Sequence, residues 1–238
     1  MTALLLLLLS VSSVLRDGDD AFRRFRYTEA IVLYESALTR NSDASGAHWR
    51  LARCYITIGD TVPRDRREPY YRDAERHAKL SVETDPLSSD AQTWYAIATG
   101  YVAMYEGVRA KVARANDIKR ALDRAVELDP RNDVAHSVLG TFYRTLGKVG
   151  WMERQLADLL LGGLPPGGFA DAERSLLKAV ELAPDIIRHR FELGQLYVDM
   201  ERPDDAKRVF TEALRYPPVL ASDHGRIERM KRRLAAPR

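Results

Sequence analysis

Apolar residues recur along the chain at helical spacing in two alternating half-motifs. The first reads Leu or Ile, then Gly or Ala, two further residues and Tyr, and it occurs at 51–55, 97–101, 139–143 and 193–197. The second has three small or apolar residues spaced by four and then three, and most copies end near a proline. Its copies begin at Ala30, Ala74, Ile118, Ala172 and Ala206. Because this spacing places side chains on one face of a helix, the alternation predicts successive pairs of antiparallel helices.

The residue types in the half-motifs suit close packing of paired helices. Small residues such as Gly140, Gly194 and Ala206 let the two helices of a pair approach, and the large residue between them fills the remaining gap. A proline then ends the second helix, because it donates no N–H and biases the preceding residue away from helical conformation. We therefore expect each helix to bury its apolar face against its neighbours.

The motifs divide the chain into five predicted repeats, at 11–44, 45–88, 91–132, 133–186 and 187–220. The second repeat has a loop rich in Pro and Arg at 61–69, and the third is expected to lengthen its helices. The fourth inserts 151–161, with apolar residues at helical spacing, and then the loop 162–168, rich in Gly and Pro. Residues 221–238 are predicted to form a basic capping helix and tail, with the apolar stripe Ile227, Met230 and Leu234.

The two half-motifs together resemble the tetratricopeptide repeat (TPR) pattern, in which two antiparallel helices carry Trp, Leu-Gly, Tyr, Ala and Pro at fixed offsets. The resemblance extends over 11–220. It implies an all-α, right-handed TPR-like solenoid of about five helix pairs, with an inserted extra helix and a C-terminal capping helix.

A narrower match runs from residue 70 to residue 218 and includes Trp94-Tyr95-Ala96-Ile97 and the Gly-Pro-Pro loop after the inserted helix. This order of segments resembles the regulator of microtubule dynamics family. The resemblance implies an all-helical TPR-like protein associated with microtubules and organelle contacts. The matching positions are Trp94, Tyr95, Lys111, Ile118, Pro130, His136, Leu139, Gly140, Trp151, Glu153, Pro165, Pro166, Ala172, Ala179 and Pro184.

The first helix of each TPR pair exposes side chains on the concave side of the solenoid. The predicted partner-binding groove consists of Trp49, Arg50, Arg53, Tyr95, Thr99, Arg144, Phe191 and Gln195. Aromatic side chains supply apolar area that loses its water on binding, and arginines make charge-assisted hydrogen bonds to carboxylates or carbonyl oxygens. In the alternative interpretation, Trp49 and Tyr95 are packing residues covered by the lengthened third repeat or by the helix 151–161.

These patterns predict a non-enzymatic scaffold or adaptor that binds a peptide or helix of a protein partner. The alternative is a microtubule- or nucleic-acid-associated factor that uses basic surfaces. In that case the binding residues would include the cations of the tail, Arg226, Arg229, Lys231, Arg232 and Arg233, which are expected to face water.

The charge balance and the available chemical groups restrict the possible classes of partner and site. The 238 residues include 37 basic and 34 acidic side chains, for a net charge of +3. This mild balance permits a nucleic-acid partner without requiring one, and no aromatic residue is interleaved in the tail for base stacking, so nucleic acid is disfavoured. Cys54 is the single cysteine, and no histidine belongs to an H-x3-H or H-E-x-x-H pair. No catalytic residue, metal site or cofactor is therefore expected.

The last feature of the sequence is an apolar run near the N-terminus. The run 3–15 is shorter than the roughly 20 apolar residues of a membrane span, so no span is expected. It fits the central region of a secretory signal, with cleavage after Ser12. We therefore expect 1–12 to be a signal and the protein to be exported to the periplasm, or to be cytoplasmic if the run is not a signal. The chain is expected to be a monomer or a weak homo-oligomer.

Overall fold

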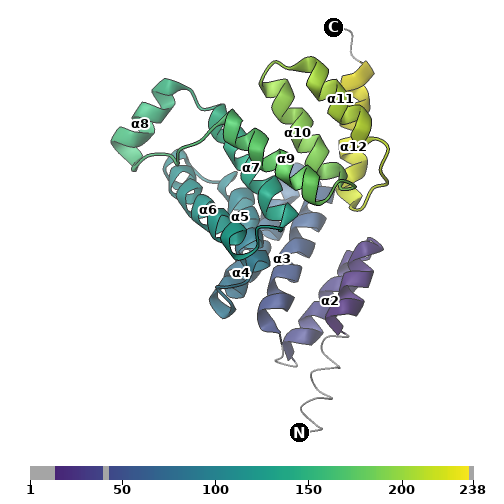
Figure 1. Cartoon of the computed structure of the whole chain (residues 1–238). Helices are drawn as coiled ribbons and strands as arrows, with labels where there is room; N and C mark the ends of the chain where they lie inside the picture. Colours follow the sequence, from purple (N-terminus) through teal and green to yellow (C-terminus); the bar gives the residue numbers. More distant parts are fainter. Residues whose placement is uncertain (1–13, 40–42, 236–238) are drawn as a thin grey trace. The chain divides into compact units, whose positions relative to one another are not determined.

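The computed structural model describes residues 14–39 and 43–235 (Figure 1). Within these ranges every regular element is a helix, so the predicted all-α class is confirmed. The chain divides into two compact units, one ending at Tyr105 and one beginning at Glu106. The boundary falls inside the third predicted repeat, between its two helices.

The first unit consists of helices that pack in chain order. After the helical residues 14–23 come α2 (Tyr27–Thr39), α3 (Ala44–Thr61), a 3-10 turn (Arg64–Arg66), α4 (Glu68–Thr84) and α5 (Ser89–Ala103). α3 packs against α2 and α4, and α5 packs against both α4 and α3. α3 thus meets both its hairpin partner, α4, and its equivalent in the next hairpin, α5.

The second unit repeats this arrangement. Its helices are α6 (Val108–Leu128), α7 (Asp133–Gly147), α8 (Trp151–Leu161), α9 (Phe169–Leu182), α10 (Ile187–Asp199), α11 (Pro203–Ala213) and α12 (Ala221–Ala235). α7 packs against α6 and α9, and α10 packs against α7, α9, α11 and α12. Contacts between neighbours in the chain are those of a solenoid, in which each pair of helices covers the apolar face of the next.

Prolines end the helices as the sequence predicts. α4 stops at Thr84, and the next residue, Asp85, is extended with φ −141° and ψ 91° ahead of Pro86. Asp129 has nearly the same conformation, φ −140° and ψ 96°, between α6 and Pro130. The ring of a proline disfavours the helical conformation in the residue before it. Each helix therefore ends two residues before the proline.

Glycines set the close approach of paired helices. A methyl group on Gly194 of α10 would come within 2.6 Å of Cδ1 and 2.7 Å of Cζ of Phe210 on α11. One on Gly140 of α7 would lie 2.5 Å from Cγ of Leu176 on α9. The Phe210 and Leu176 side chains are almost completely buried. The glycines therefore provide the space that the large residue of the second helix fills.

This packing predicts that Gly194→Ala lowers the free energy of unfolding. The added methyl group cannot be accommodated unless Phe210 shifts, and overpacking of this kind costs about 1–3 kcal/mol. We expect urea unfolding to show that loss, and we expect Phe210→Leu in the same chain to restore part of it by removing ring atoms. Equal losses from Gly194→Ala in the natural and Phe210→Leu backgrounds would contradict the contact.

The insertions fall near the predicted positions, with one difference. The inserted helix is α8, with the predicted bounds, and it is followed by the non-helical loop 162–168. The loop predicted at 61–69 is shorter than expected. Helix α3 continues to Thr61, and α4 begins at Glu68 with Pro69 in its first turn, where the missing N–H would have no partner within the helix. Helix α6, at 21 residues, is lengthened as expected.

The predicted apolar stripe of the C-terminal helix is confirmed. Met230 of α12 is fully buried in a cluster formed mainly by α10 and α11, and Ile227 and Leu234 pack against that cluster. The prediction that Arg226 faces water is wrong. Its guanidinium bonds the buried Asp223 carboxylate at 3.0 Å, and only 12% of its side chain is exposed. Asp223 also accepts the backbone N–H groups of Val219 and Leu220, at 3.0 and 2.9 Å, which fixes the start of α12.

Candidate functional site

Two of the predicted groove arginines converge on one carboxylate in the first unit. Arg50 and Arg53 lie one turn apart on α3, and Asp19 lies in the preceding helical segment 14–23. Nε of Arg50 donates to both oxygens of Asp19, at 3.1 and 3.0 Å, and Nη2 of Arg53 donates to Oδ1 at 2.7 Å. The three side chains are each 19% exposed. Two positive charges and one negative charge therefore share a partly buried site.

Aromatic rings surround this ion cluster. The guanidinium of Arg50 lies 4.1 Å from the ring centre of Trp49, and that of Arg53 lies 3.9 Å from the ring centre of Phe22. The Tyr34 hydroxyl of α2 donates to Oδ1 of Asp19 at 2.8 Å and accepts from Nη2 of Arg53 at 3.0 Å. Stacking on ring faces fixes the planes of both guanidinium groups. We name these six residues, Asp19, Phe22, Tyr34, Trp49, Arg50 and Arg53, the α3 face.

The charges of the α3 face hold Asp19 ionised. Burial alone would raise the pKa of its carboxyl, but the nearby Arg50 and Arg53 and the hydrogen bonds from Tyr34 and Arg53 lower the pKa below its ordinary value. Burial raises the pKa of the Tyr34 hydroxyl, which therefore stays protonated as a donor. The cluster keeps one excess positive charge beside a partly exposed indole.

Two further groove predictions fall in the first unit, with different outcomes. Tyr95 of α5 is partly buried and packs against the cluster that contains Tyr71 and Trp94, as does Trp49. Thr99 has no exposed surface. The prediction that Thr99 lines a groove is therefore wrong, because α5 packs against both α3 and α4 and this position is buried.

The remaining groove predictions fall in the second unit. Arg144 of α7 bonds Glu192 at 2.8 Å and lies 3.2 Å from Asp199, both on α10, and Asp199 also pairs with Lys148 at 3.0 Å. Gln195 is partly exposed beside them. As on the α3 face, an arginine of one hairpin is neutralised by carboxylates of the neighbouring hairpin.

The prediction for Phe191 is wrong. Its ring is only 4% exposed, because Phe210 packs on it at 6.2 Å between ring centres and the Arg229 guanidinium of α12 lies 4.8 Å from it. The capping helix covers the last repeat, so a side chain that was expected to be exposed is buried.

A histidine pair that the groove prediction did not include joins α3 and α4. Nδ1 of His48 lies 3.0 Å from Nδ1 of His77, and the Tyr55 ring stacks on His77 with 5.6 Å between centres. Burial, with the nearby Arg76 and His48, lowers the pKa of His77 to about 4. Burial and Arg76 also lower the pKa of His48. Both rings are therefore neutral at pH 7.

This pair predicts a loss of stability as pH falls. The pKa of His77 in the folded chain, about 4, is below the value of about 6.5 in an unfolded chain. The unfolded state therefore takes up the proton first, and the stabilising contribution is complete above pH 6.5 and disappears towards pH 4. We expect the free energy of unfolding to fall by about 2 kcal/mol between pH 7 and pH 5.

Urea unfolding at the two pH values measures this loss. His77→Phe should flatten the pH dependence, leaving the parts that come from His48 and the buried His189, whose pKa values burial also lowers. The matched control is His224→Gln, which removes an exposed histidine that is not part of the pair. If the free energy of unfolding of His77→Phe depends on pH as strongly as that of the natural chain, groups other than His77 cause the dependence.

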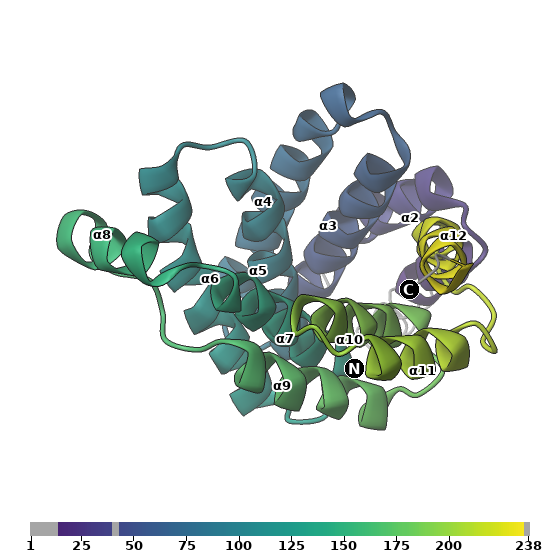
Figure 2. The same ribbon diagram turned by 90° about the horizontal axis from the view of Figure 1, so that it is seen from above.

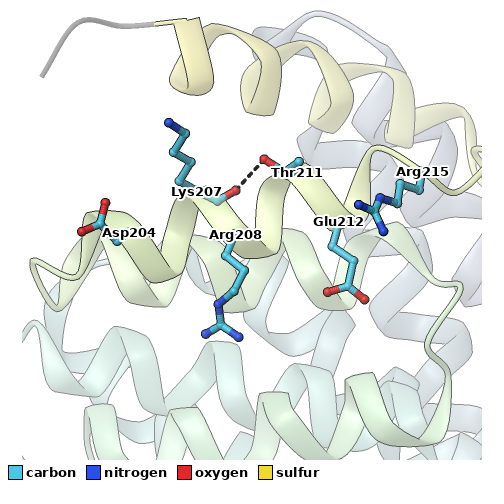
Figure 3. A pocket seen from close by; sticks show the side chains of 6 residues that line it. All are labelled: Asp204, Lys207, Arg208, Thr211, Glu212 and Arg215. Atoms are coloured by element: carbon cyan, nitrogen blue, oxygen red, sulfur yellow. Dashed lines mark hydrogen bonds between the residues drawn. The ribbon is translucent and has the colours of Figure 1, made fainter.

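The outer face of α11 has a shallow hollow, which Figure 3 shows. Its lining is polar and ion-paired. Arg208 bonds Asp205 at 2.7 Å, Glu212 bonds Arg190 at 2.8 Å, and the Thr211 hydroxyl bonds the carbonyl oxygen of Lys207 at 2.8 Å. The lining residues are Asp204, Lys207, Arg208, Thr211, Glu212 and Arg215. Since this is one charged face of a single helix, it does not form an enclosed site.

Other candidate chemistry is sparse in the described part of the chain. No group of three or more His, Cys, Asp or Glu side chains gathers there as metal ligands do. The Cys54 side chain is fully buried, and burial raises the pKa of its thiol to about 12, so the thiol is protonated at neutral pH. Among residues 14–39 and 43–235, no helix has the length and apolar character to cross a membrane.

Residues 14–236 match the sequence profile of the family described as Regulator of microtubule dynamics protein 1-3. The mouse Regulator of microtubule dynamics protein 1 is 28% identical over 202 residues, which cover 79% of this chain and 66% of that protein. The human Regulator of microtubule dynamics protein 2 is 27% identical over 177 residues, which cover 74% of this chain. The chain spans only 43% of the length of that relative.

Among solved structures, a thermophilic TPR protein from Thermus thermophilus has the same fold. It is 24% identical, with a TM-score of 0.70, and the match covers 95% of this chain and all of that one. The TPR-like solenoid predicted from the half-motifs is confirmed. The segment 1–12, predicted to be an export signal, lies outside the described residues, and the relatives lend that prediction no support.

Proposed function

Because the chain belongs to the regulator of microtubule dynamics family, we propose that it is a non-enzymatic interaction scaffold whose α3 face binds a peptide or helix of a protein partner. The observation that carries the proposal is the arrangement of Trp49, Arg50 and Arg53. A partly exposed indole lies beside two guanidinium groups that share one carboxylate. Tryptophan and arginine dominate the binding energy of protein interfaces.

The ion cluster contributes to this role by keeping the face ordered. The carboxylate of Asp19 and the hydroxyl of Tyr34 fix the arginine side chains before any partner arrives. Ordering a long side chain on binding costs about 0.5–1.5 kcal/mol, so prior ordering increases affinity. Because Asp19 neutralises only one of the two cations, the face still attracts a carboxylate or a row of carbonyl oxygens.

A capture experiment tests the proposal. The immobilised full chain is incubated with an extract of the source cells, and captured proteins are quantified by mass spectrometry for the natural chain and for Trp49→Ala. Since truncation of a central interface aromatic costs about 2 kcal/mol or more, partners of the α3 face should be depleted at least tenfold. Leu80→Ala gives the matched control, because Leu80 is an exposed residue of α4 and is not part of this face.

A second candidate function is association with microtubules through basic surfaces. Four cations of α12, Arg229, Lys231, Arg232 and Arg233, are exposed, and the relatives are named as regulators of microtubule dynamics. Charge-driven binding weakens steeply as salt rises. Co-sedimentation with polymerised tubulin that is lost at raised salt and in Lys231→Gln/Arg232→Gln/Arg233→Gln, but is kept in Trp49→Ala, would favour this candidate over the first.

A further inference from the structure

Helix α8 has a large exposed apolar surface. Its residues Trp151, Met152, Leu156, Leu159 and Leu160 each expose between 54% and 80% of their surface. Figures 1 and 2 both show α8 at the margin of its unit, where it packs against α6. Apolar patches of more than a few hundred Å² mark interaction sites in soluble proteins.

These side chains form one stripe. With about 100° of rotation per residue in an α-helix, Met152, Leu156, Leu159 and Leu160 fall within an arc of roughly 100°, and Trp151 extends it at the first turn. Ala157 is the buried residue of α8 and lies about 110° from the middle of that arc. The stripe therefore points away from the body of the unit.

Polar contacts at both ends hold α8 in this orientation. Nη2 of Arg154 donates to the backbone carbonyl oxygens of Leu146 and Gly167, the latter at 3.1 Å. Nδ2 of Asn116 on α6 donates to the carbonyl oxygen of Gly163 at 3.2 Å. Gly162 and Gly163 have φ of 83° and 84°, a conformation that glycine adopts without strain. The exposure of the stripe is thus built into the fold.

The stripe carries almost no charge. The Glu153 carboxylate lies against Gly150 at the start of the helix, and that of Asp158 lies beside Gly163 at its end. The single cation, Arg154, is bound to backbone carbonyls. Helices that lie on lipid surfaces carry many Lys and Arg on their polar face, and α8 does not. A charge-free apolar face instead suits an equally charge-free apolar face.

We propose that α8 is a self-association surface, and that its occupant is α8 of a second copy of this chain. Leu156 is the central residue of Trp151–Leu161, so an antiparallel crossing at Leu156 places Met152 of each copy against Leu160 of the other. The same patch then serves both subunits, as two-fold symmetric interfaces require. In this pairing, the stripe of each copy covers the stripe of the other, and no different partner is needed.

The size of the stripe predicts a weak interface. Five large side chains with these exposures amount to an apolar area on the order of 500 Å² per copy, which is near the lower limit for a specific interface when both copies are counted. An interface of this size belongs to the weak or transient class, so the dimer should form only at high protein concentration. The pairing is independent of the α3 face, so Trp49→Ala should leave it unchanged.

Sedimentation velocity of the full chain tests this surface. The natural chain should shift from 27.0 kDa towards twice that mass as its concentration rises to about 200 μM, a range in which weak interfaces form. Leu156→Glu brings two carboxylates together at the symmetry axis and should weaken the dimer at least a hundredfold. Leu177→Glu is the matched control, because Leu177 is 48% exposed on α9, and it should dimerise normally.

A cysteine at the axis gives a second readout that does not depend on a disruptive change. Leu156→Cys should form a disulfide-linked dimer under mild oxidation, whereas Leu177→Cys should not, and the buried native Cys54 should not interfere. A natural chain that stays monomeric at 200 μM overturns the proposal, as does a dimer that persists in Leu156→Glu. A monomer that instead binds phosphatidylcholine vesicles through Leu156 also overturns it and assigns the stripe to lipid.

Discussion

Phe210→Ala is expected to destabilise the second unit by about 3–5 kcal/mol. The ring is 1% exposed, and it packs on Gly194 and lies beside Phe191 of α10. Its removal takes apolar surface out of the core and leaves a cavity that the neighbouring helices can close only in part. Met230 of α12 is part of the same cluster, so the capping helix should loosen as well.

Two measurements check the Phe210→Ala prediction. In urea unfolding followed by far-UV circular dichroism, the free energy should fall by this amount. Amide hydrogen exchange should become faster across α10, α11 and α12 and stay unchanged in α3 and α4. Leu177→Ala removes an exposed side chain and should cost well under 1 kcal/mol. A loss of that small size in Phe210→Ala would mean that the α10–α11 contact is not a core contact.

Asp19→Asn is expected to cost about 2–3 kcal/mol, the second largest of the predicted losses. The change keeps the shape of the side chain and removes the charge that Arg50 and Arg53 share. Two partly buried guanidinium groups then face each other without compensation, and removing one partner of a buried ion pair is strongly destabilising. The 19% exposure of these side chains places the cost below that of a fully buried pair.

Although Asp19→Asn should lower stability, it should raise the affinity of the α3 face for anions. With the carboxylate neutralised, the α3 face has two uncompensated cations, so its affinity for an acidic probe such as hexaglutamate should rise and should depend more steeply on salt. Fluorescence anisotropy of the labelled probe measures this effect. Asp65→Asn changes the same charge at an exposed position of the first unit and is the control. If both variants behave alike, Asp19 does not organise the arginines.

The helices could be predicted from the sequence because their periodicity directly reports burial. Ala172, Leu176 and Ala179 fall on one face of α9 and are all fully buried. Apolar spacing also located α8, although that stripe is exposed, and glycines and prolines located the following loop. These features depend on residues close in sequence, and the local pattern contains the information.

The ion cluster depends on residues distant in sequence, and the groove prediction did not include Asp19. A signal was present, since Asp19 and Arg53 are separated by 34 residues, the length of one TPR unit. Residues one repeat apart occupy equivalent positions on adjacent helices and face each other. Comparing charges at that offset pairs Arg53 with a carboxylate of the chain itself.

The incorrect groove predictions have a common cause. Position within the repeat predicts exposure only in part, because exposure also depends on what packs next to the repeat. Phe191 belongs to the last repeat and is covered by the capping helix, and Thr99 is buried on a helix that packs against two neighbours. A repeat pattern gives the average environment of a position, and the ends and insertions of the array change it.

The most direct test of the α3 face is site-specific photo-crosslinking. A benzophenone amino acid is placed at Arg23, an exposed residue one turn from Asp19 that is not part of the α3 face, or at Leu80 of α4 as the control in the same unit. The full chain is irradiated in an extract of the source cells. If the α3 face binds a protein partner, position 23 should give discrete adducts that position 80 does not give. Identical adducts from both positions, or none from position 23, would contradict the account.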